Sequence, residues 1–339
     1  MNEKTKILVS GVAGFVGSSL IDELQKTEKF AVYGLVGKRN QLGINNQAGL
    51  EKIFQSDISD YKTLKDAEEL KNIEILVHTA GLAHQFGPVK KEDFWRVNVD
   101  GTENVCRLAQ KIGVRHFILT SSVAVYGNYG KVEIDETFAR HPEGFYAQSK
   151  LESEEKAREF CDKNNIQLTI LRLATVIGEG DRGNTSRLIT LIDKGRFIWI
   201  GNGVNKKSLI DKADVAKGIL RVAEGQLDNE TQIYNLTGET VSMREIVTTI
   251  ARDLNKRTPR LKIPDKLVRG FFRVNKSGFS IEYLKKFEKT FEKWLSDDVF
   301  SGKKFNEKYN FKPETTVYEA LSKQVNYYLS QKNKKSDKR

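Results

Sequence analysis

Cysteine and histidine are scarce in this sequence. Cys106 and Cys161 are the only cysteines among 339 residues, and only four histidines are present. Two thiols cannot form a disulfide framework, so we expect a reducing compartment and a cytoplasmic protein. The histidines do not have the spacing of metal ligands, and no cysteine pair supplements them, which argues against a metal site.

Long apolar runs are also missing. No segment approaches the roughly 18–20 apolar residues that cross a bilayer, so no membrane span is expected. The start of the chain, "MNEKTKILVS", lacks the apolar region of a signal peptide. Neither a P-loop nor a G-x-S-x-G nucleophile motif is present, which weakens the corresponding hydrolase classes.

Basic residues outnumber acidic residues, and the net charge is +11 at pH 7. Part of it lies in the tail "QKNKKSDKR", residues 331–339, which has no apolar residue and is predicted to be disordered. The other cations are scattered along the sequence, so we expect no nucleic-acid partner. The positive net charge is equally compatible with an anionic small-molecule ligand. The aromatics of residues 279–295 have near-helical spacing, which indicates core packing, with a membrane-surface helix as the alternative.

Short β-branched runs alternate with helical patterns, which predicts an α/β fold with a doubly wound parallel sheet. The predicted strands are residues 6–10, 31–36, 53–57, 73–80, 116–122, 168–174 and 233–236. The predicted helices are roughly 15–27, 61–70, 92–112, 146–163 and 211–224.

This alternation loosens after residue 175. We interpret 1–174 as a first domain, to which 209–238 return. Residues 175–208 and 239–330 are interpreted as a smaller C-terminal α/β domain for the substrate. Within it, Ser242 and Glu245 occupy capping-box positions at the start of a helix.

A glycine-rich turn follows the first predicted strand and opens the first predicted helix. In "VSGVAGFVGSSL", Gly11, Gly14 and Gly17 have the spacing G-x-x-G-x-x-G. Glycine lets the backbone turn sharply and approach a pyrophosphate, which then lies at the helix N-terminus. A glycine triad alone is a weak signal, but the strand before it and the helix after it strengthen the prediction of a dinucleotide site. We include Phe15 and Val16 in that site.

The second predicted strand lacks the acidic residue that often accepts hydrogen bonds from the adenosine ribose. Lys38 and Arg39 follow it instead, and two cations there favour the 2′-phosphate of NADP over NAD. They fit equally well as solvated loop residues. Asp57 and Ile58, after the third strand, are placed to hold an adenine edge, and a turn is the alternative for Asp57.

Small and polar residues end the next strands, where open α/β sheets bind ligands. We assign the remaining predicted cofactor contacts to Ala80, Gly81, Asn98, Ser121 and Leu173. Asn98 has an alternative role, a hydrogen bond across strands without ligand contact.

One turn of helix separates a tyrosine and a lysine in "FYAQSKLESE", and a serine ends the strand before them. A phenol has an ordinary pKa near 10, and an ammonium group nearby stabilises the phenolate. Tyr146 is therefore a candidate acid/base, Lys150 its modulator and a ribose ligand, and Ser122 the partner of a carbonyl or alcohol. Each residue alone is more often structural. Their joint occurrence in this order predicts hydride transfer between a substrate carbon and a nicotinamide.

Together these residues resemble the extended short-chain dehydrogenase/reductases, and within them the nucleotide-sugar epimerase/dehydratase group. "TSSVAVYG" and "FYAQSKLESE" are close to that group's patterns, and similarity continues through "LRLATVIGEGD", "KKSLIDKADVAKGI" and "YNFKPETTVYEAL". It covers about residues 5 to 330. The resemblance implies a Rossmann-type NAD(P) domain, a small domain for a nucleoside-diphosphate sugar, and a homodimer formed by the helices around 92–112 and 146–163.

The resemblance also implies contacts with the sugar nucleotide. By position these fall on Ser122, Val123, Tyr146, Thr175, Asn184 and Lys207. Lys207 stands where the group often has an arginine near the diphosphate, and Thr175 stands where hexose epimerases carry an asparagine. Val123 and Ala124 replace the Asp–Glu pair of sugar 4,6-dehydratases, which argues against dehydration.

Several reactions stay open at this point. We favour action at C4 of a UDP-linked sugar, either by an epimerase that keeps its NAD or by a 4-ketoreductase that uses exchangeable NADPH. The segment "GDRGNTSRLITLIDKGRFIWIGNG" also resembles the 4-reductases of acetamido-sugar pathways. The alternatives are an NADPH-dependent reductase of a steroid- or flavonoid-type carbonyl and a non-catalytic NADP-sensing regulator.

Overall fold

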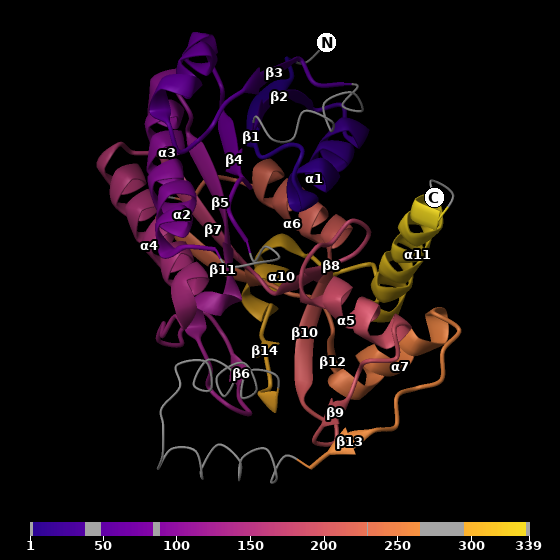
Figure 1. The fold of residues 1–339 in the computed structure, drawn as a ribbon. Coiled ribbons are helices and arrows are strands. Elements are labelled where there is room, and N and C mark those ends of the chain that lie inside the picture. Colours follow the sequence, from indigo (N-terminus) through magenta and orange to yellow (C-terminus); the bar gives the residue numbers. More distant parts are fainter. Residues whose placement is uncertain (1–2, 38–48, 84–88, 229, 265–294, 337–339) are drawn as a thin grey trace.

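A computed structural model describes residues 3–37, 49–83, 89–228, 230–264 and 295–336 (Figure 1). Its centre is a seven-stranded parallel sheet with the order β11-β7-β5-β4-β1-β2-β3. The strands are β1 (Thr5–Ser10), β2 (Phe30–Val36), β3 (Lys52–Gln55), β4 (Ile75–His78), β5 (His116–Ser122), β7 (Gln167–Leu173) and β11 (Gln232–Leu236). The order reverses beside β1, which confirms the predicted Rossmann-type sheet.

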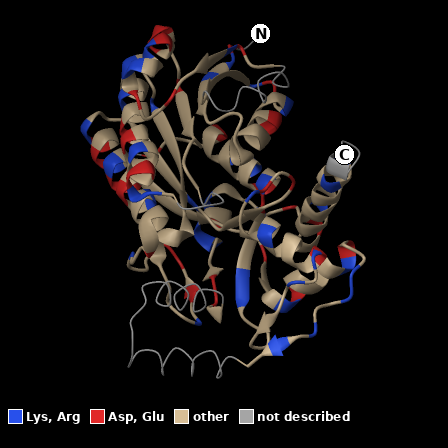
Figure 2. Cartoon of the chain, viewed as in Figure 1, with Lys and Arg blue, Asp and Glu red and all other residues tan. Residues whose placement is uncertain are grey.

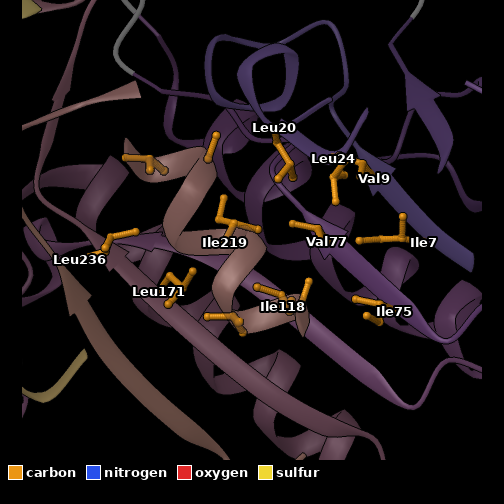
Figure 3. Close-up of a cluster of buried hydrophobic side chains, with 14 of the residues drawn as sticks. Ile7, Val9, Leu20, Leu24, Ile75, Val77, Ile118, Leu171, Ile219 and Leu236 are labelled. Atoms are coloured by element: carbon orange, nitrogen blue, oxygen red, sulfur yellow. The ribbon is translucent and has the colours of Figure 1, made fainter. Parts of the chain in front are cut away.

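Helices cover both faces of this sheet. On one face α1 (Phe15–Lys26) packs against α6 (Lys212–Glu224), and on the other α3 (Gly101–Ile112) packs against α4 (Gly144–Lys163). Most of these strands are buried on both sides, so apolar residues dominate them, although β7 contains Arg172. Figure 3 shows the core under α1 and α6, where side chains such as Leu20, Ile219 and Val77 converge from the helices and the sheet.

A second, smaller core lies beside the carboxyl edge of the main sheet. It contains the mixed sheet β12-β10-β8, formed by β8 (Thr175–Ile177), β10 (Lys206–Asp211) and β12 (Thr240–Ser242). Three helices pack on it: α5 (Asn184–Asp193), α7 (Met243–Asp253) and α11 (Val317–Ser336). The capping box predicted at Ser242 and Glu245 is present at the start of α7.

Short strand pairs connect the remaining segments. β6 (Glu133–Ile134) pairs with β14 (Val299–Phe300), and β9 (Trp199–Ile200) pairs with β13 (Lys262–Ile263). The 3-10 helix η4 (Val123–Tyr126) follows β5, and α10 (Lys303–Tyr309) packs beside β11. Through η4, β6 and β14, the smaller core meets the end of β5.

Helix boundaries differ from the prediction in two places. Residues 61–70 form a 3-10 helix, η2 (Tyr61–Glu69), and residues 92–112 divide into α2 (Lys91–Phe94), the π-helix η3 (Trp95–Asp100) and α3. The described helices contain no segment both long and apolar enough to cross a bilayer. Figure 2 shows charges of both signs interspersed along α3 and α4, in line with the scattered charge of the sequence.

The predicted disorder of the tail is wrong for residues 331–336, because α11 continues to Ser336. The apolar residues earlier in α11 anchor the helix in the smaller core, and the polar end extends from them. Lys332 supports this extension, since its Nζ lies 2.6 Å from a carboxylate oxygen of Asp193 in α5. Helix propagation from a packed segment thus outweighs composition here.

Candidate active site

The proposed acid/base pair lies at the start of α4, on the predicted helix. Tyr146 and Lys150 are four residues apart, so their side chains project from the same face one turn apart. Gly144, with φ of +79°, precedes Tyr146 and lets the chain turn into the helix from an extended segment. Phe94 of α2 packs edge-on against the Tyr146 ring, at 6.2 Å between ring centroids, which fixes the orientation of the phenol.

The end of β5 brings a second hydroxyl group to the same place. Ser122 is the last residue of β5 and the N-cap of η4, where its Oγ accepts a hydrogen bond from the Ala124 amide at 3.2 Å. The hydroxyls of Ser122 and Tyr146 are hydrogen-bonded to each other. Two hydroxyls that meet at the carboxyl edge of the sheet can bind one oxygen atom of an alcohol or carbonyl.

Lys150 lies beneath these hydroxyls. Its side chain is nine-tenths buried, and its Nζ donates a hydrogen bond to the Thr120 carbonyl oxygen of β5 at 2.6 Å. Burial lowers the pKa of Lys150 to about 8, and the carboxylate of Glu154 offsets part of this effect. The structure therefore brings together all three predicted catalytic residues.

The expected direction of the tyrosine shift is wrong in this structure. Burial raises the pKa of Tyr146, and the hydrogen bond from Ser122 offsets only part of the rise. We expected the Lys150 ammonium to lower this pKa, but here its Nζ is committed to the Thr120 carbonyl oxygen. Desolvation of the phenol outweighs the hydrogen bond from Ser122.

The glycine turn fits a dinucleotide. Gly11 has φ of +81°, and a Cβ on Gly11 would lie 2.8 Å from the Ala80 backbone nitrogen. A Cβ on Gly17 would lie 2.1 Å from the Gly11 carbonyl oxygen. Gly14 is the N-cap of α1 and contributes no side-chain cap, and the first turn contains no acidic residue. The backbone amides at this helix end are thus suited to an anionic pyrophosphate.

Other predicted cofactor residues lie around that turn. Ala80 and Gly81 follow β4 next to Gly11, and Phe15 and Val16 form the first turn of α1. The Asp57 carboxylate accepts hydrogen bonds from the Ser59 amide and hydroxyl, as the turn alternative predicted. Ile58 packs beneath Gly101 of α3. The two predicted cations Lys38 and Arg39 lie outside the described residues.

Asn98 holds two segments of the site together. Its side-chain oxygen accepts from the Leu82 amide at 2.7 Å, and its nitrogen donates to the Leu82 carbonyl at 3.0 Å and the Ser149 hydroxyl at 2.9 Å. Ser149 in turn donates to the Tyr146 carbonyl. The alternative of a bond across strands is wrong, because the partners of Asn98 lie in the loop after β4 and in α4.

The predicted substrate residues are spread around the proposed catalytic pair. Val123 is buried directly after Ser122, and Leu173, a predicted cofactor contact, ends the neighbouring strand β7. Thr175 and Asn184 are exposed, at the starts of β8 and α5. Lys207 of β10 donates to a carboxylate oxygen of Asp298 at 2.6 Å and to the Ser296 carbonyl at 2.9 Å.

A buried ion pair behind the site was not predicted. Glu154 of α4 and Arg172 of β7 form a salt bridge of 2.8 Å, with both side chains 2% exposed. Ser121 does not turn its hydroxyl to the proposed cofactor region but donates it to Glu154 at 2.5 Å. The sequence carried a signal for this pair, because a single arginine interrupts the apolar strand "LTILRLA".

Comparison with protein families identifies a match over most of the chain. The model described as "NAD dependent epimerase/dehydratase family" matches residues 7–237. N-acetyl-alpha-D-glucosaminyl-diphospho-ditrans,octacis-undecaprenol 4-epimerase of Escherichia coli O157:H7 is 29% identical over 268 residues, which are 76% of this chain and 75% of that protein. UDP-glucose 4-epimerase of Vibrio cholerae is 29% identical over 265 residues, 76% of this chain and 78% of that protein.

Solved structures share the fold. UDP-glucuronic acid 4-epimerase from Bacillus cereus, in complex with NAD, superposes with a TM-score of 0.75. Its sequence is 20% identical, and the match covers 96% of this chain and 99% of that one. At this identity the similarity establishes a common architecture over nearly the whole length.

Proposed function

Because the chain belongs to the NAD-dependent epimerase/dehydratase family, we propose that it acts at C4 of a UDP-linked sugar by hydride transfer. The observation that carries the proposal is the meeting of Ser122, Tyr146 and Lys150 at the end of β5, in a sheet whose first strand ends in the glycine turn. Two of the similar proteins are named 4-epimerases of diphosphate-linked sugars, which supports C4 as the reacting position.

The chain's own residues then have distinct tasks. Tyr146 exchanges a proton with the C4 oxygen, and Ser122 donates a hydrogen bond to that oxygen, which holds C4 in place. Lys150 holds the nicotinamide ribose and, once its Nζ leaves the Thr120 carbonyl oxygen, stabilises the phenolate form of Tyr146 by its charge. The bound dinucleotide supplies or accepts the hydride.

The remaining residues bind the two diphosphates. The amides at the start of α1 bind the pyrophosphate of the dinucleotide, approached closely because Gly11, Gly14 and Gly17 lack side chains. Lys207 binds the diphosphate of the sugar nucleotide, which requires its ammonium group to exchange part of its contact with Asp298 for phosphate oxygens.

The net reaction is either epimerisation or a single reduction of a 4-keto sugar. The absence of an acidic residue after β2 and the presence of Lys38 and Arg39 favour exchangeable NADP. Val123 and Ala124 after Ser122 provide no acid for dehydration. We also propose a homodimer through α3 and α4, which light scattering of the purified protein tests.

The cofactor content of the purified protein tests the proposal. Denatured protein is expected to release stoichiometric NAD if the enzyme is an epimerase, measured by absorbance and mass spectrometry. Protein that is purified without cofactor and binds NADPH from solution indicates a reductase. Failure to bind either dinucleotide would refute the proposed function. Turnover is then assayed with UDP-sugars, with polyprenol-diphosphate sugars and a sterol ketone as competing substrate classes.

A further inference from the structure

We propose that the buried pair of Glu154 and Arg172 is a positioning device for the site, and that the Glu154 carboxylate keeps Lys150 in its charged form. The inference rests on the proposed function, because it assigns a task to side chains that lie behind the proposed catalytic residues. Neither Glu154 nor Arg172 is proposed to touch the substrate or the cofactor.

The pair has a two-pronged geometry. Nε of Arg172 lies 3.1 and 3.3 Å from the two carboxylate oxygens of Glu154, and Nη2 lies 2.8 Å from Oε2. Both side chains are 2% exposed. A buried pair of this kind contributes little net stability, because desolvation opposes the attraction between the charges. We therefore infer the role of the pair from the groups to which its two side chains are hydrogen-bonded.

Glu154 connects the catalytic helix to the end of β5. Its Oε1 accepts the hydroxyl of Ser121, the residue before Ser122, at 2.5 Å. Since Glu154 and Lys150 lie one turn apart on α4, this contact fixes the distance between the helix and the strand at the place where Tyr146 meets Ser122. The relative position of the Ser122 and Tyr146 hydroxyls thus depends on the contact between Glu154 and Ser121.

Arg172 connects β7 to the turn that follows Ser122. Its Nη1 donates to the Tyr126 hydroxyl at 2.9 Å, and its guanidinium group stacks on the Tyr126 ring at 4.9 Å. The Tyr126 hydroxyl donates to Oδ1 of Asn235 in β11 at 2.8 Å. Ser122 and Tyr126 bound the short helix η4, so Arg172 holds η4 against β7 and β11.

The groups around Lys150 show what the contact with Glu154 opposes. Lys150 faces Tyr146 and Glu154 from α4, the Thr120 carbonyl from β5 and His78 from β4, and beyond Glu154 lies Arg172 of β7. Burial lowers the pKa of His78 to about 3, and Lys150 adds to this, so His78 is neutral. Glu154 is the carboxylate whose charge offsets the burial of Lys150. Without it, two buried cations would share this space.

The test follows the titration of Lys150 itself. Protein labelled with ¹³C at the lysine Cε positions is titrated by NMR, and the Lys150 signal is identified by its loss in Lys150→Arg. We expect Lys150 to titrate near pH 8 in the wild type. In Glu154→Gln, which keeps the shape but removes the charge, the midpoint is expected to fall by about one pH unit or more. An unchanged midpoint would overturn the proposal.

Two variants separate charge from structure. Glu152→Gln alters a carboxylate on the same helix that bonds to Trp95 instead, so the Lys150 midpoint is expected to remain that of the wild type. If Glu154→Gln does not fold, Arg172→Gln replaces it. Removal of that cation is expected to raise the midpoint, and a fall or no change would contradict the proposal.

The positioning role is tested separately, by Arg172→Lys. It retains the charge but loses the two-pronged bond and the contact with Tyr126. We expect the Lys150 midpoint to be unchanged while kcat falls at least tenfold with little change in KM. Unchanged kcat would refute the positioning role. The NMR titration needs neither cofactor nor substrate, so its outcome is distinct from failure of the proposed function, which would appear as absent cofactor binding in the wild type.

Discussion

Gly17 packs so closely against Gly11 that a Cβ on Gly17 would lie 2.1 Å from the Gly11 carbonyl oxygen. No side-chain rotation relieves this contact, because the backbone fixes the position of the Cβ and the atom that it meets is a backbone oxygen. Gly17→Ala is therefore expected to displace the glycine turn and weaken dinucleotide binding at least a hundredfold, as measured by NADPH fluorescence titration. Ser18→Ala, which adds no atom in the same turn of α1, is the matched control. Retained affinity in Gly17→Ala would contradict the assignment of the turn.

Tyr146→Phe removes the proposed proton donor and leaves the ring packed against Phe94. We expect kcat to fall by about 10²–10⁴-fold, the usual contribution of a positioned acid/base. Cofactor affinity is expected to change less than threefold. A regulator that only senses NADP would keep its cellular function after this change, so loss of that function in cells would reject the sensor alternative.

Asn98→Ala is expected to reduce stability by about 3 kcal/mol, because it removes three hydrogen bonds worth about 1 kcal/mol each. Asn104→Ala in the neighbouring helix removes one bond, to the Ile58 carbonyl, and should cost about 1 kcal/mol. Urea unfolding of the two variants gives the comparison. Equal losses would mean that Asn98 does not join Leu82 to α4 as described.

Because His78 is buried, we expect the stability of the fold to fall in acid. Burial lowers its pKa from the ordinary 6.5 to about 3, while its ring bonds to Ser10 and Thr102. Between these two pKa values the unfolded chain binds a proton that the folded chain does not, so stability falls as the pH falls. The expected slope from His78 is about 1.4 kcal/mol per pH unit.

Urea unfolding at pH 6.5, 5.5 and 4.5 measures this slope. His78→Gln should remove that contribution, whereas the exposed His141→Gln should not. Burial also lowers the pKa of His116, to about 4, so part of the pH dependence persists in both variants. The same slope in wild type and His78→Gln would show that His78 is not buried in its neutral form.

Most strands of the sheet could be predicted from the sequence, because a short apolar run can be recognised as a strand from its own residues. β5, residues 116–122, has the predicted limits. The predicted strand 73–80 is shortened to Ile75–His78, and Thr79 and Ala80 lie against Gly11 of the glycine turn. The π-helix η3 was not predicted. The helical end of α11 was beyond a pattern argument, since it is supported by the tertiary contact between Lys332 and Asp193.

The site likewise has features that could be predicted from the sequence and features that could not. Tyr146, Lys150 and Ser122 were predictable because their spacing reflects one helix turn and one strand end. The raised pKa of Tyr146 and the ion pair between Glu154 and Arg172 were not, because they depend on burial and on contacts between α4 and β7. Sequence identifies which groups meet, whereas desolvation decides their protonation.

Transfer of a hydride from C4 is the central claim, and isotope transfer tests it most directly. The protein is incubated in water with UDP-sugars that carry deuterium at C4, and the sugar and the cofactor are then analysed by mass spectrometry. We predict that the deuterium does not exchange with water: an epimerase returns it to C4 of its product, and a reductase run in reverse with oxidised cofactor leaves it in the reduced nicotinamide. Loss of the C4 deuterium to water, or transfer from sugars deuterated at C3 instead, would contradict the account.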